Sequence, residues 1–273
     1  MKQRLIVAGV GIPVLLLILL AAPVWATAAM CALLSAVGCY ELMHAVGKDE
    51  WKLLCLMPLF AAWMCTSIGL GEEWTPEPGL YMAAACFVAV VYTFAMAVVT
   101  HGRERSLSFR TAMAGLFAMS GIAAGFACLV ILRDISPAVV LTPFIGAFMS
   151  DTGAFFAGRA FGKRKLCPAV SPNKTVAGCI GGFVGSIAGM AVFHLVVKTW
   201  FQLDLGWGVV ILMGVIGSLF GQLGDLSFSV IKREFGIKDY GAIFPGHGGV
   251  LDRFDSVLFV APAYLLFMLL YFA

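Results

Sequence analysis

The sequence predicts an all-α, polytopic integral membrane protein with about nine transmembrane helices. Of its 273 residues, 61% are hydrophobic and only 12% are charged, whereas soluble domains carry about 25% charged residues. The mean hydropathy is +0.97, and apolar runs of the roughly 20 residues needed to cross a bilayer recur along the whole chain. Because lipid offers the backbone no hydrogen-bond partners, each run is expected to be a helix.

The predicted spans follow one another with short connections. They cover residues 5–22, 24–45, 52–70, 79–100, 111–132, 138–160, 176–201, 207–230 and 255–272. The first span is expected to stay uncleaved, because further spans follow it immediately. We divide the chain into an N-terminal group of transmembrane helices, 1–135, and a C-terminal group, 136–273, which contains the polar segment 229–255.

The distribution of Lys and Arg predicts the orientation. With the N-terminus inside, 16 of the 18 Lys and Arg residues fall on the cytoplasmic side, and only Arg133 and Lys198 fall outside. Cytoplasmic loops of membrane proteins carry such an excess. The polar segments 162–175 and 231–255 are therefore expected in the cytoplasm, and Ala273 is expected on the far side.

Three carboxylates lie inside predicted spans, where charges are costly and usually functional. Glu41 is near the cytoplasmic end of its span, where it is expected to reach water or to pair with His44. Asp151 lies midway along the span 138–160, and a structural hydrogen bond and a functional site are both open there. Asp225 is the strongest candidate for a site.

The helical spacing around Asp225 places polar residues on one helix face. This polar ladder has members at positions i, i+3, i+7 and i+10, which are Gln222, Asp225, Ser229 and Lys232. Small residues at four-residue spacing let helices approach closely. Such glycines are Gly181, Gly185, Gly189, Gly217 and Gly221. They predict close packing of the spans 176–201 and 207–230 and make these helices candidates for a homodimer contact.

The polar segment 231–255 combines the groups that bind phosphate. It holds four cations and three aspartates around the glycine-rich turn PGHGG (245–249). Glycines let a backbone approach a phosphate closely, cations bind the phosphate, and carboxylates hold the Mg²⁺ that accompanies it. The segment therefore predicts a nucleotide or phosphate site. The phosphate-loop pattern GxxxxGK[ST] is not met, because Arg159 follows Gly158 where Lys is required.

One longer signature runs through residues 229–255. It reads S-x-I-K-R (229–233), K-D-x-G (238–241) and P-x-H-G-G-V-x-D-R-F-D (245–255). Upstream, it is accompanied by D-T (151–152), G-R (158–159), S-P-x-K-T (171–175) and G-D-L (224–226). In these residues the chain resembles the phosphatidate cytidylyltransferase (CDP-diacylglycerol synthase) family. The family usually has Glu where this chain has Ala177.

The resemblance implies an activity, partners and a location. The expected reaction transfers CMP from CTP to phosphatidic acid and gives CDP-diacylglycerol and pyrophosphate in phospholipid biosynthesis. The expected partners are CTP, phosphatidic acid and membrane lipids, with no nucleic acid. The expected cofactor is Mg²⁺, and a second cation is left open. The enzyme is expected in the bacterial inner (plasma) membrane, with its active site in a cytoplasm-facing polar cavity formed by the C-terminal helices.

The resemblance also implies roles for individual residues. The expected metal ligands are Asp225, Asp252 and Asp255. The expected catalytic residues, most of which would neutralise phosphate charge, are Lys232, Arg233, Lys238, Asp239, His247 and Arg253. Among them, His247 is expected to donate a hydrogen bond to a phosphate oxygen rather than to act as a base. The expected substrate-binding residues are Asp151, Arg159, Ser171, Lys174, Thr175, Ser229, Gly248 and Gly249.

Two other classes of function are left open. Another CTP-using membrane lipid enzyme, such as a polyprenol kinase or an ether-lipid cytidylyltransferase, would use the same polar groups, and apolar spans carry no readable code for the lipid tail. An ion-coupled transporter would use Asp151 and Asp225 as an ion pathway. Transporters often show paired internal repeats, however, and the pattern of residues 225–255 has no second copy in the sequence. The phosphatidate enzyme is therefore favoured.

Overall fold

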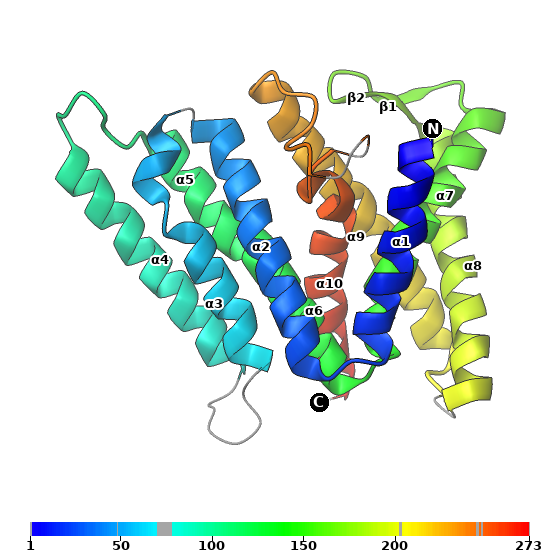
Figure 1. Cartoon of the computed structure of the whole chain (residues 1–273). Helices are drawn as coiled ribbons and strands as arrows, with labels where there is room; N and C mark the ends of the chain where they lie inside the picture. Colours follow the sequence, from blue (N-terminus) through cyan, green and yellow to red (C-terminus); the bar gives the residue numbers. More distant parts are fainter. Residues whose placement is uncertain are drawn as a thin grey trace. The chain divides into compact units, whose positions relative to one another are not determined.

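A computed structural model gives the fold of the chain (Figure 1). It describes residues 2–47, 49–69, 78–201, 204–243, 246 and 248–272. Most of these residues are helical, and several helices are long and apolar enough to cross a membrane. The prediction of an all-α, polytopic membrane protein is confirmed.

The long helices follow the predicted spans in order. They are α1 (Lys2–Leu20), α2 (Val24–Gly47), α3 (Met57–Gly69), α4 (Pro78–Thr100), α5 (Phe109–Phe117), α6 (Ala124–Ile135), α7 (Thr142–Phe161), α8 (Val176–Phe201), α9 (Trp207–Glu234) and α10 (Leu251–Phe272). Among the described residues, eight segments are long and apolar enough to span a membrane. The apolar stretch found in α1, Gly11–Leu20, is shorter than a span, so the ninth span stays a prediction.

Three short turns modify the predicted spans. The 3-10 helix η1 (Glu50–Leu54) leads to α3, and the 3-10 helix η3 (Val139–Leu141) leads directly into α7. The π-helical turn η2 (Ala118–Ala123) joins α5 to α6. The predicted span 111–132 is therefore one continuous helical segment with a π-helical insertion, a feature that hydropathy does not reveal.

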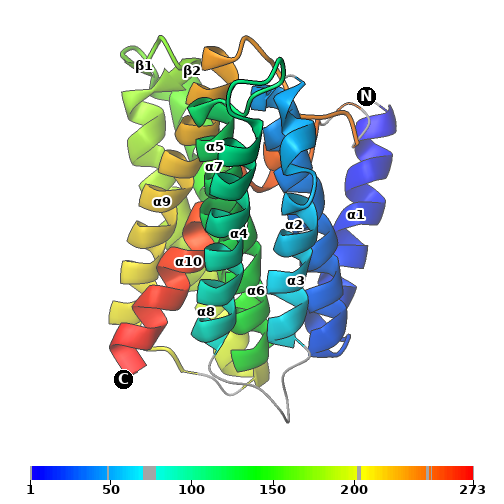
Figure 2. The ribbon, with the colours of Figure 1, turned by 90° about the vertical axis from the view of Figure 1, so that its left-hand side faces the viewer.

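The chain divides into two compact units. The first unit comprises Met1–Pro137 together with Phe235–Phe254. In this unit α2 packs against α3 and α6, and Figure 2 shows α2 and α3 side by side. The segment Phe235–Phe254 of this unit packs with the N-terminal helices, and the expected division into 1–135 and 136–273 stays a prediction.

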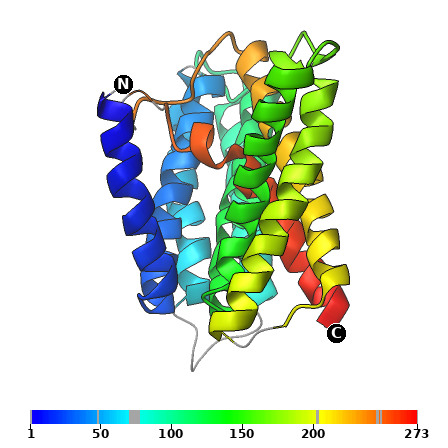
Figure 3. The same ribbon diagram turned by 90° about the vertical axis from the view of Figure 1, so that its right-hand side faces the viewer.

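The second unit comprises Ala138–Glu234 and Asp255–Ala273. It contains α7, α8, α9 and most of α10, and its most extensive helix contact joins α7 to α8, which lie side by side in Figure 3 (green and yellow-green). Gly153 of α7 lies so close to α8 that a Cβ atom there would collide with the backbone of Gly181 and Gly185. The two helices therefore meet backbone to backbone.

The glycine run of α8 has a different partner from the predicted one. Cβ atoms on Gly181, Gly185 and Gly189 would collide with residues of α7, not of α9. Helices α8 and α9 do pack together, and a Cβ on Gly214 of α9 would meet the backbone of Ile187. The predicted packing of the spans 176–201 and 207–230 is confirmed, but the glycine run itself faces α7. Contacts within the unit occupy these glycines, and a homodimer contact through them stays a prediction.

A short hairpin joins α7 to α8. Its strands β1 (Lys165–Cys167) and β2 (Ser171–Thr175) pair antiparallel, with Lys165 opposite Thr175. Thr175 then begins α8, because its Oγ1 accepts a hydrogen bond of 3.1 Å from the backbone N–H of Gly178, as an N-cap residue does. The hairpin and the cap together fix the backbone position of Lys174, from which its side chain extends.

Candidate active site

The second unit contains a cavity of about 680 Å³, within the range of roughly 300–1,000 Å³ typical of ligand sites. It lies among α7, the β1–β2 hairpin, α8 and α9. Five of its lining residues were predicted to bind substrate or metal, namely Asp151, Arg159, Lys174, Thr175 and Asp225. The others are Ala154, Phe155, Gly158, Leu166, Asn173, Gly178, Cys179 and Gln222. Charged groups thus share the cavity with apolar walls.

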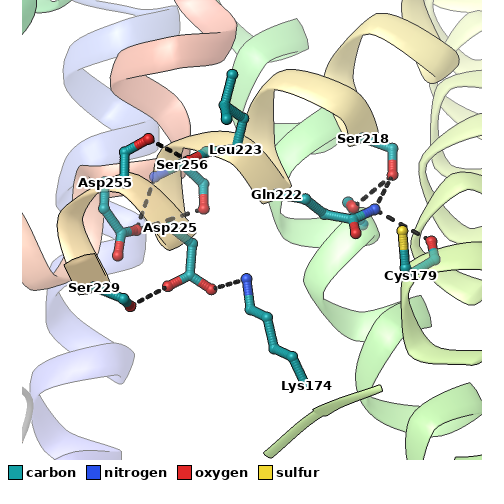
Figure 4. A network of polar contacts seen from close by, with 11 residues as sticks. Lys174, Cys179, Ser218, Gln222, Leu223, Asp225, Ser229, Asp255 and Ser256 are labelled. Carbon is teal, nitrogen blue, oxygen red and sulfur yellow. Dashed lines mark hydrogen bonds and ion pairs between the residues drawn. The ribbon is translucent and has the colours of Figure 1, made fainter. Parts of the chain in front are cut away.

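Two of the charged lining residues, Lys174 and Asp225, form an ion pair. The Lys174 Nζ is 2.6 Å from the Asp225 Oδ2, and the two side chains are 25% and 29% exposed. The hydroxyl of Ser229, one helical turn further along α9, donates to the other Asp225 oxygen at 3.3 Å. Figure 4 shows the Asp225 carboxylate held between these two groups. The hairpin and the helix α9 therefore present one cation and one carboxylate to the same space.

Gln222 fixes the part of the polar ladder that precedes Asp225. Its Nε2 donates to the Oγ of Ser218 at 2.7 Å and to the backbone oxygen of Cys179 at 3.2 Å. Ser218 is itself 2.9 Å from the Oγ of Ser150 on α7. This buried network ties α7, α8 and α9 together directly beside the ion pair (Figure 4). It holds the cavity wall in place and leaves Asp225 as the charged member of the ladder that faces the cavity.

Three carboxylates of the second unit act on one another. The charges of Asp151 and Asp225 interact, and Asp255 interacts with both of them and with Lys232. Asp255 lies beside Asp225 in Figure 4 because α10 approaches α9 closely at Gly224, where a Cβ atom would collide with the backbone oxygen of Asp255. Among the cations, Lys174 acts on Asp151 and Lys232 acts on Asp255.

These carboxylates fit a divalent cation that is shared with a substrate. Carboxylate oxygens are the ligands that Mg²⁺ prefers, and Mg²⁺ is usually held by one or two carboxylates together with substrate phosphates. Within the described ranges, no group of three His, Cys, Asp or Glu residues is arranged to hold a metal by itself. Asp225 and Asp255 therefore suit a cation that arrives with phosphate, and their role as metal ligands stays a prediction.

The remaining predicted residues of the second unit lie around the hairpin and the end of α9. Arg233 donates from its Nε to the backbone oxygen of Val170 at 3.2 Å, which ties the end of α9 to the hairpin turn. Ser171 begins β2, and Arg159 is exposed in the last turn of α7. Lys232, in the last turn of α9, is half-buried.

The other predicted residues belong to the first unit. Asp252 is buried there, and its Oδ2 accepts hydrogen bonds from the backbone N–H groups of Tyr240 at 2.8 Å and Gly249 at 3.0 Å. Gly248 has a φ of +88°, a conformation that glycine adopts readily. The remaining described members are exposed side chains: Lys238, Asp239 and Arg253. His247 lies outside the described residues.

Some lining residues carried no sequence signal. Cys179 belongs to an apolar span, and only its backbone oxygen takes part in the network. Asn173 adjoins Lys174 in the hairpin and lines the cavity with it. Gln222 did have a signal, because its helical spacing placed it on the face of Asp225. Polar residues at helical spacing inside a span were therefore detectable, whereas backbone acceptors were not.

Fold and cavity together define a polytopic membrane protein with a charged, ligand-sized site among its helices. Residues 2–271 match the Cytidylyltransferase family, and the chain belongs to this family. It is similar to the phosphatidate cytidylyltransferase of Staphylococcus haemolyticus, with 36% identity over 234 residues that cover 84% of this chain and 85% of the relative. A phosphatidate cytidylyltransferase of Staphylococcus aureus is 42% identical over 184 residues, which cover 66% and 65% of the two chains. The predicted family is confirmed.

Proposed function

We propose that this protein is a phosphatidate cytidylyltransferase, which transfers CMP from CTP to phosphatidic acid. The observation that carries the proposal is the Lys174–Asp225 pair in a ligand-sized cavity of a membrane protein. The family and the relatives named above support the same reaction. The match to the Cytidylyltransferase family covers residues 2–271. It therefore favours an enzyme over an ion-coupled transporter.

The reaction requires positioning and charge neutralisation more than a strong base. A phosphate oxygen of phosphatidate attacks the α-phosphorus of CTP, the bond from that phosphorus to the α–β bridging oxygen breaks, and pyrophosphate leaves with the electron pair. The attacking phosphate is already ionised near neutral pH, so no strong general base has to remove a proton. Catalysis then depends on aligning the reactants and on stabilising the charge of the phosphates.

The cations around the cavity supply this neutralisation. Lys174 pairs with Asp225, and a substrate phosphate would compete with that carboxylate for the same ammonium group. Arg159 lines the cavity, and Lys232 and Arg233 lie at the end of α9. We assign Lys238 and Arg253 of the other unit to the same task because they belong to the same signature.

A divalent cation fits the acids of the site, and we propose that it is Mg²⁺. When bound, it neutralises phosphate charge and makes the α-phosphorus easier to attack. Asp225 and Asp255 are the residues that we expect to hold it, with Asp252 as a third ligand. The Oδ2 atom of Asp252 also accepts hydrogen bonds from two backbone N–H groups.

The apolar part of the cavity suits a lipid substrate. Phe155 and Leu166 line it together with the charged residues, and Phe155 is 60% exposed. We propose that the acyl chains stay in the bilayer while the headgroup enters. We also propose that the cavity faces the cytoplasm, where CTP is available, that the N-terminus lies inside, and that the protein resides in the bacterial cell membrane.

A labelling assay tests the reaction. Purified protein in detergent is incubated with CTP labelled in its α-phosphate and with phosphatidate, an ether-linked phosphate lipid or a polyprenol. We expect label in the lipid fraction with phosphatidate. A polyprenol kinase would transfer the γ-phosphate and leave the label in CDP, and faster labelling of the ether lipid would favour the ether-lipid enzyme. Label that stays in CTP with all lipids would overturn the proposal.

Cysteine labelling tests the orientation. Ala242→Cys introduces a thiol at an exposed position in the segment 231–255, and Asp204→Cys introduces one between α8 and α9. With a membrane-impermeant reagent on intact cells, Asp204→Cys should react and Ala242→Cys should not. The unaltered chain gives the background from its native cysteines. The opposite pattern would reverse the proposed orientation.

A further inference from the structure

The carboxylate of Glu41, on α2, binds the start of α10. Glu41 is 3% exposed, and its Oε1 and Oε2 accept hydrogen bonds of 3.0 Å each from the backbone N–H groups of Val250 and Leu251. The expectation that Glu41 reaches water or pairs with His44 is therefore wrong. His44 stacks on Tyr40 instead, with ring centroids 5.5 Å apart.

The glycines of the signature segment make room for this carboxylate. A Cβ atom on Gly241 or on Gly249 would collide with the carboxyl group of Glu41. The neighbouring Gly248 would meet the carboxylate of Asp252 in the same way, at 2.7 Å. With the bonds from Tyr240 and Gly249 to Asp252, four backbone N–H groups of this segment are held by two buried acids.

Apolar contacts hold the same turn of α10 in the first unit. Leu251 is fully buried, and a Cβ on Gly38 of α2 would lie 3.1 Å from its side chain. Phe254 lies against Phe126 of α6, with ring centroids 5.4 Å apart. Helices α2 and α6 therefore both contact the beginning of α10. These contacts are part of the reason that Phe235–Phe254 belongs to the first unit.

The N-terminal N–H groups of a helix attract anions, and a phosphate is the obvious alternative occupant. In this protein the groups of Val250 and Leu251 already bind Glu41. A phosphate there would have to displace a buried carboxylate of the same charge. The acid is thus a fixed part of the scaffold at this point, and Gly241 and Gly249 leave room for it.

We infer that Glu41 is a positioning residue for the transfer reaction, because it sets the start and the rotation of the helix turn that carries Asp252, Arg253 and Asp255. This inference rests on the proposed function. Glu41 touches no substrate in this scheme and acts through the backbone of Val250 and Leu251. Removing a group that orients a metal or substrate ligand typically lowers activity by about 10- to 100-fold.

Glu50 provides a matched control in the same unit. Its Oε2 accepts hydrogen bonds from the backbone N–H of Ser108 at 2.9 Å, from the Ser108 hydroxyl at 2.6 Å and from the Thr111 hydroxyl at 2.7 Å. It therefore braces the start of α5 as Glu41 braces the start of α10. No residue of α5 is assigned to the reaction, so Glu50→Gln reports on stability alone.

The experiment compares Glu41→Gln with Glu50→Gln in the intact protein. Gln keeps the size of the side chain but can accept only one of the two backbone hydrogen bonds through its oxygen. For Glu41→Gln we expect kcat to fall at least about tenfold per folded molecule, with a higher Mg²⁺ concentration at half-maximal rate and a KM for CTP within about threefold of the unaltered protein. For Glu50→Gln we expect a lower unfolding temperature but unchanged kcat and Mg²⁺ dependence.

Equal kcat values per folded molecule for the two variants would overturn the inference. If Glu41→Gln does not fold, Gly241→Ala takes its place, because a methyl group there displaces the Glu41 carboxyl; the same loss of kcat is expected, and an unchanged kcat would again overturn the inference. The unaltered protein in the same labelling assay separates this result from the proposed function. If it labels phosphatidate, a negative result concerns Glu41 alone.

Discussion

Two ion pairs of the second unit have the same length and different surroundings. Lys174, just before the start of α8, lies 2.6 Å from Asp225 of α9, and Lys198, near the end of α8, lies 2.6 Å from Asp204. The first pair is 25% and 29% exposed, whereas the second is 51% and 53% exposed. Length alone would therefore give the two pairs equal weight.

Their neighbours separate them. Asp225 accepts a hydrogen bond from Ser229 and interacts with two further acids in a cavity. Asp204 accepts the backbone N–H of Gly206 at 3.0 Å and lies 3.5 Å from His194, so it closes the turn before α9. An exposed pair of this kind contributes little to stability. These neighbours, rather than the length of the ion pair, make Asp225 the candidate for a site.

The largest effect is expected for Asp225→Asn. The substitution keeps the shape and removes the charge that would hold a cation, so cytidylyl transfer should fall at least ~100-fold, on the order of 3 kcal/mol of transition-state stabilisation. Thermal unfolding and transfer are measured on the same preparation. A packing role for Asp225 predicts the reverse pattern, a less stable protein with near-normal activity per folded molecule.

A smaller loss is expected for Lys174→Met, which keeps the length of the side chain and removes its charge. We expect about a tenfold lower kcat/KM, or roughly 1.4 kcal/mol, mainly through a higher KM for CTP. Combined with Asp225→Asn, the loss should be smaller than the product of the two single losses, because the residues share one interaction. Independent losses in this double-mutant cycle would show that the pair does not act together.

Ala177→Glu should have a moderate effect. It restores the acid usual in the family within the first turn of α8, where a negative charge stabilises a helix by about 0.3–1 kcal/mol. We expect a slightly higher unfolding temperature and a measurable change in turnover across a Mg²⁺ titration. An unaltered titration curve would show that this departure from the family is neutral.

The smallest effect is expected for Asp204→Asn. The hydrogen bond from Lys198 lowers the pKa of the Asp204 carboxyl, so its stabilising effect is present above the ordinary pKa of Asp and is lost as the pH falls through the lowered value. We expect unchanged transfer at neutral pH and unfolding temperatures that converge with those of the unaltered protein on acidification. A loss of transfer comparable to that of Asp225→Asn would remove the distinction between the two pairs.

Hydropathy and short-range spacing were sufficient for the helical fold and the polar ladder, whereas the family was indicated by the resemblance of the signature in residues 229–255. Asp225 and Gln222 were placed on one face of a span because they are three positions apart in a helix. The partner of Glu41 could not be predicted, because its hydrogen bonds reach Val250 and Leu251 across more than 200 residues. Spacing defines which face of a helix is polar or small, and only tertiary packing defines what that face meets.

The backbone contact between α7 and α8 also determines which sequence changes the family can accumulate here. At Gly153, Gly181 and Gly185 even one methyl group would collide with atoms of the neighbouring helix, whereas at Gly208, in the first turn of α9, no atom of the described residues lies within 4 Å. In a saturation library selected for growth, we expect only glycine at the three contact positions and many different residues at position 208. The packing of α7 against α8, which both line the cavity, thus depends on residues that have no side chains. We expect these glycines to tolerate as few substitutions as the charged residues of the site.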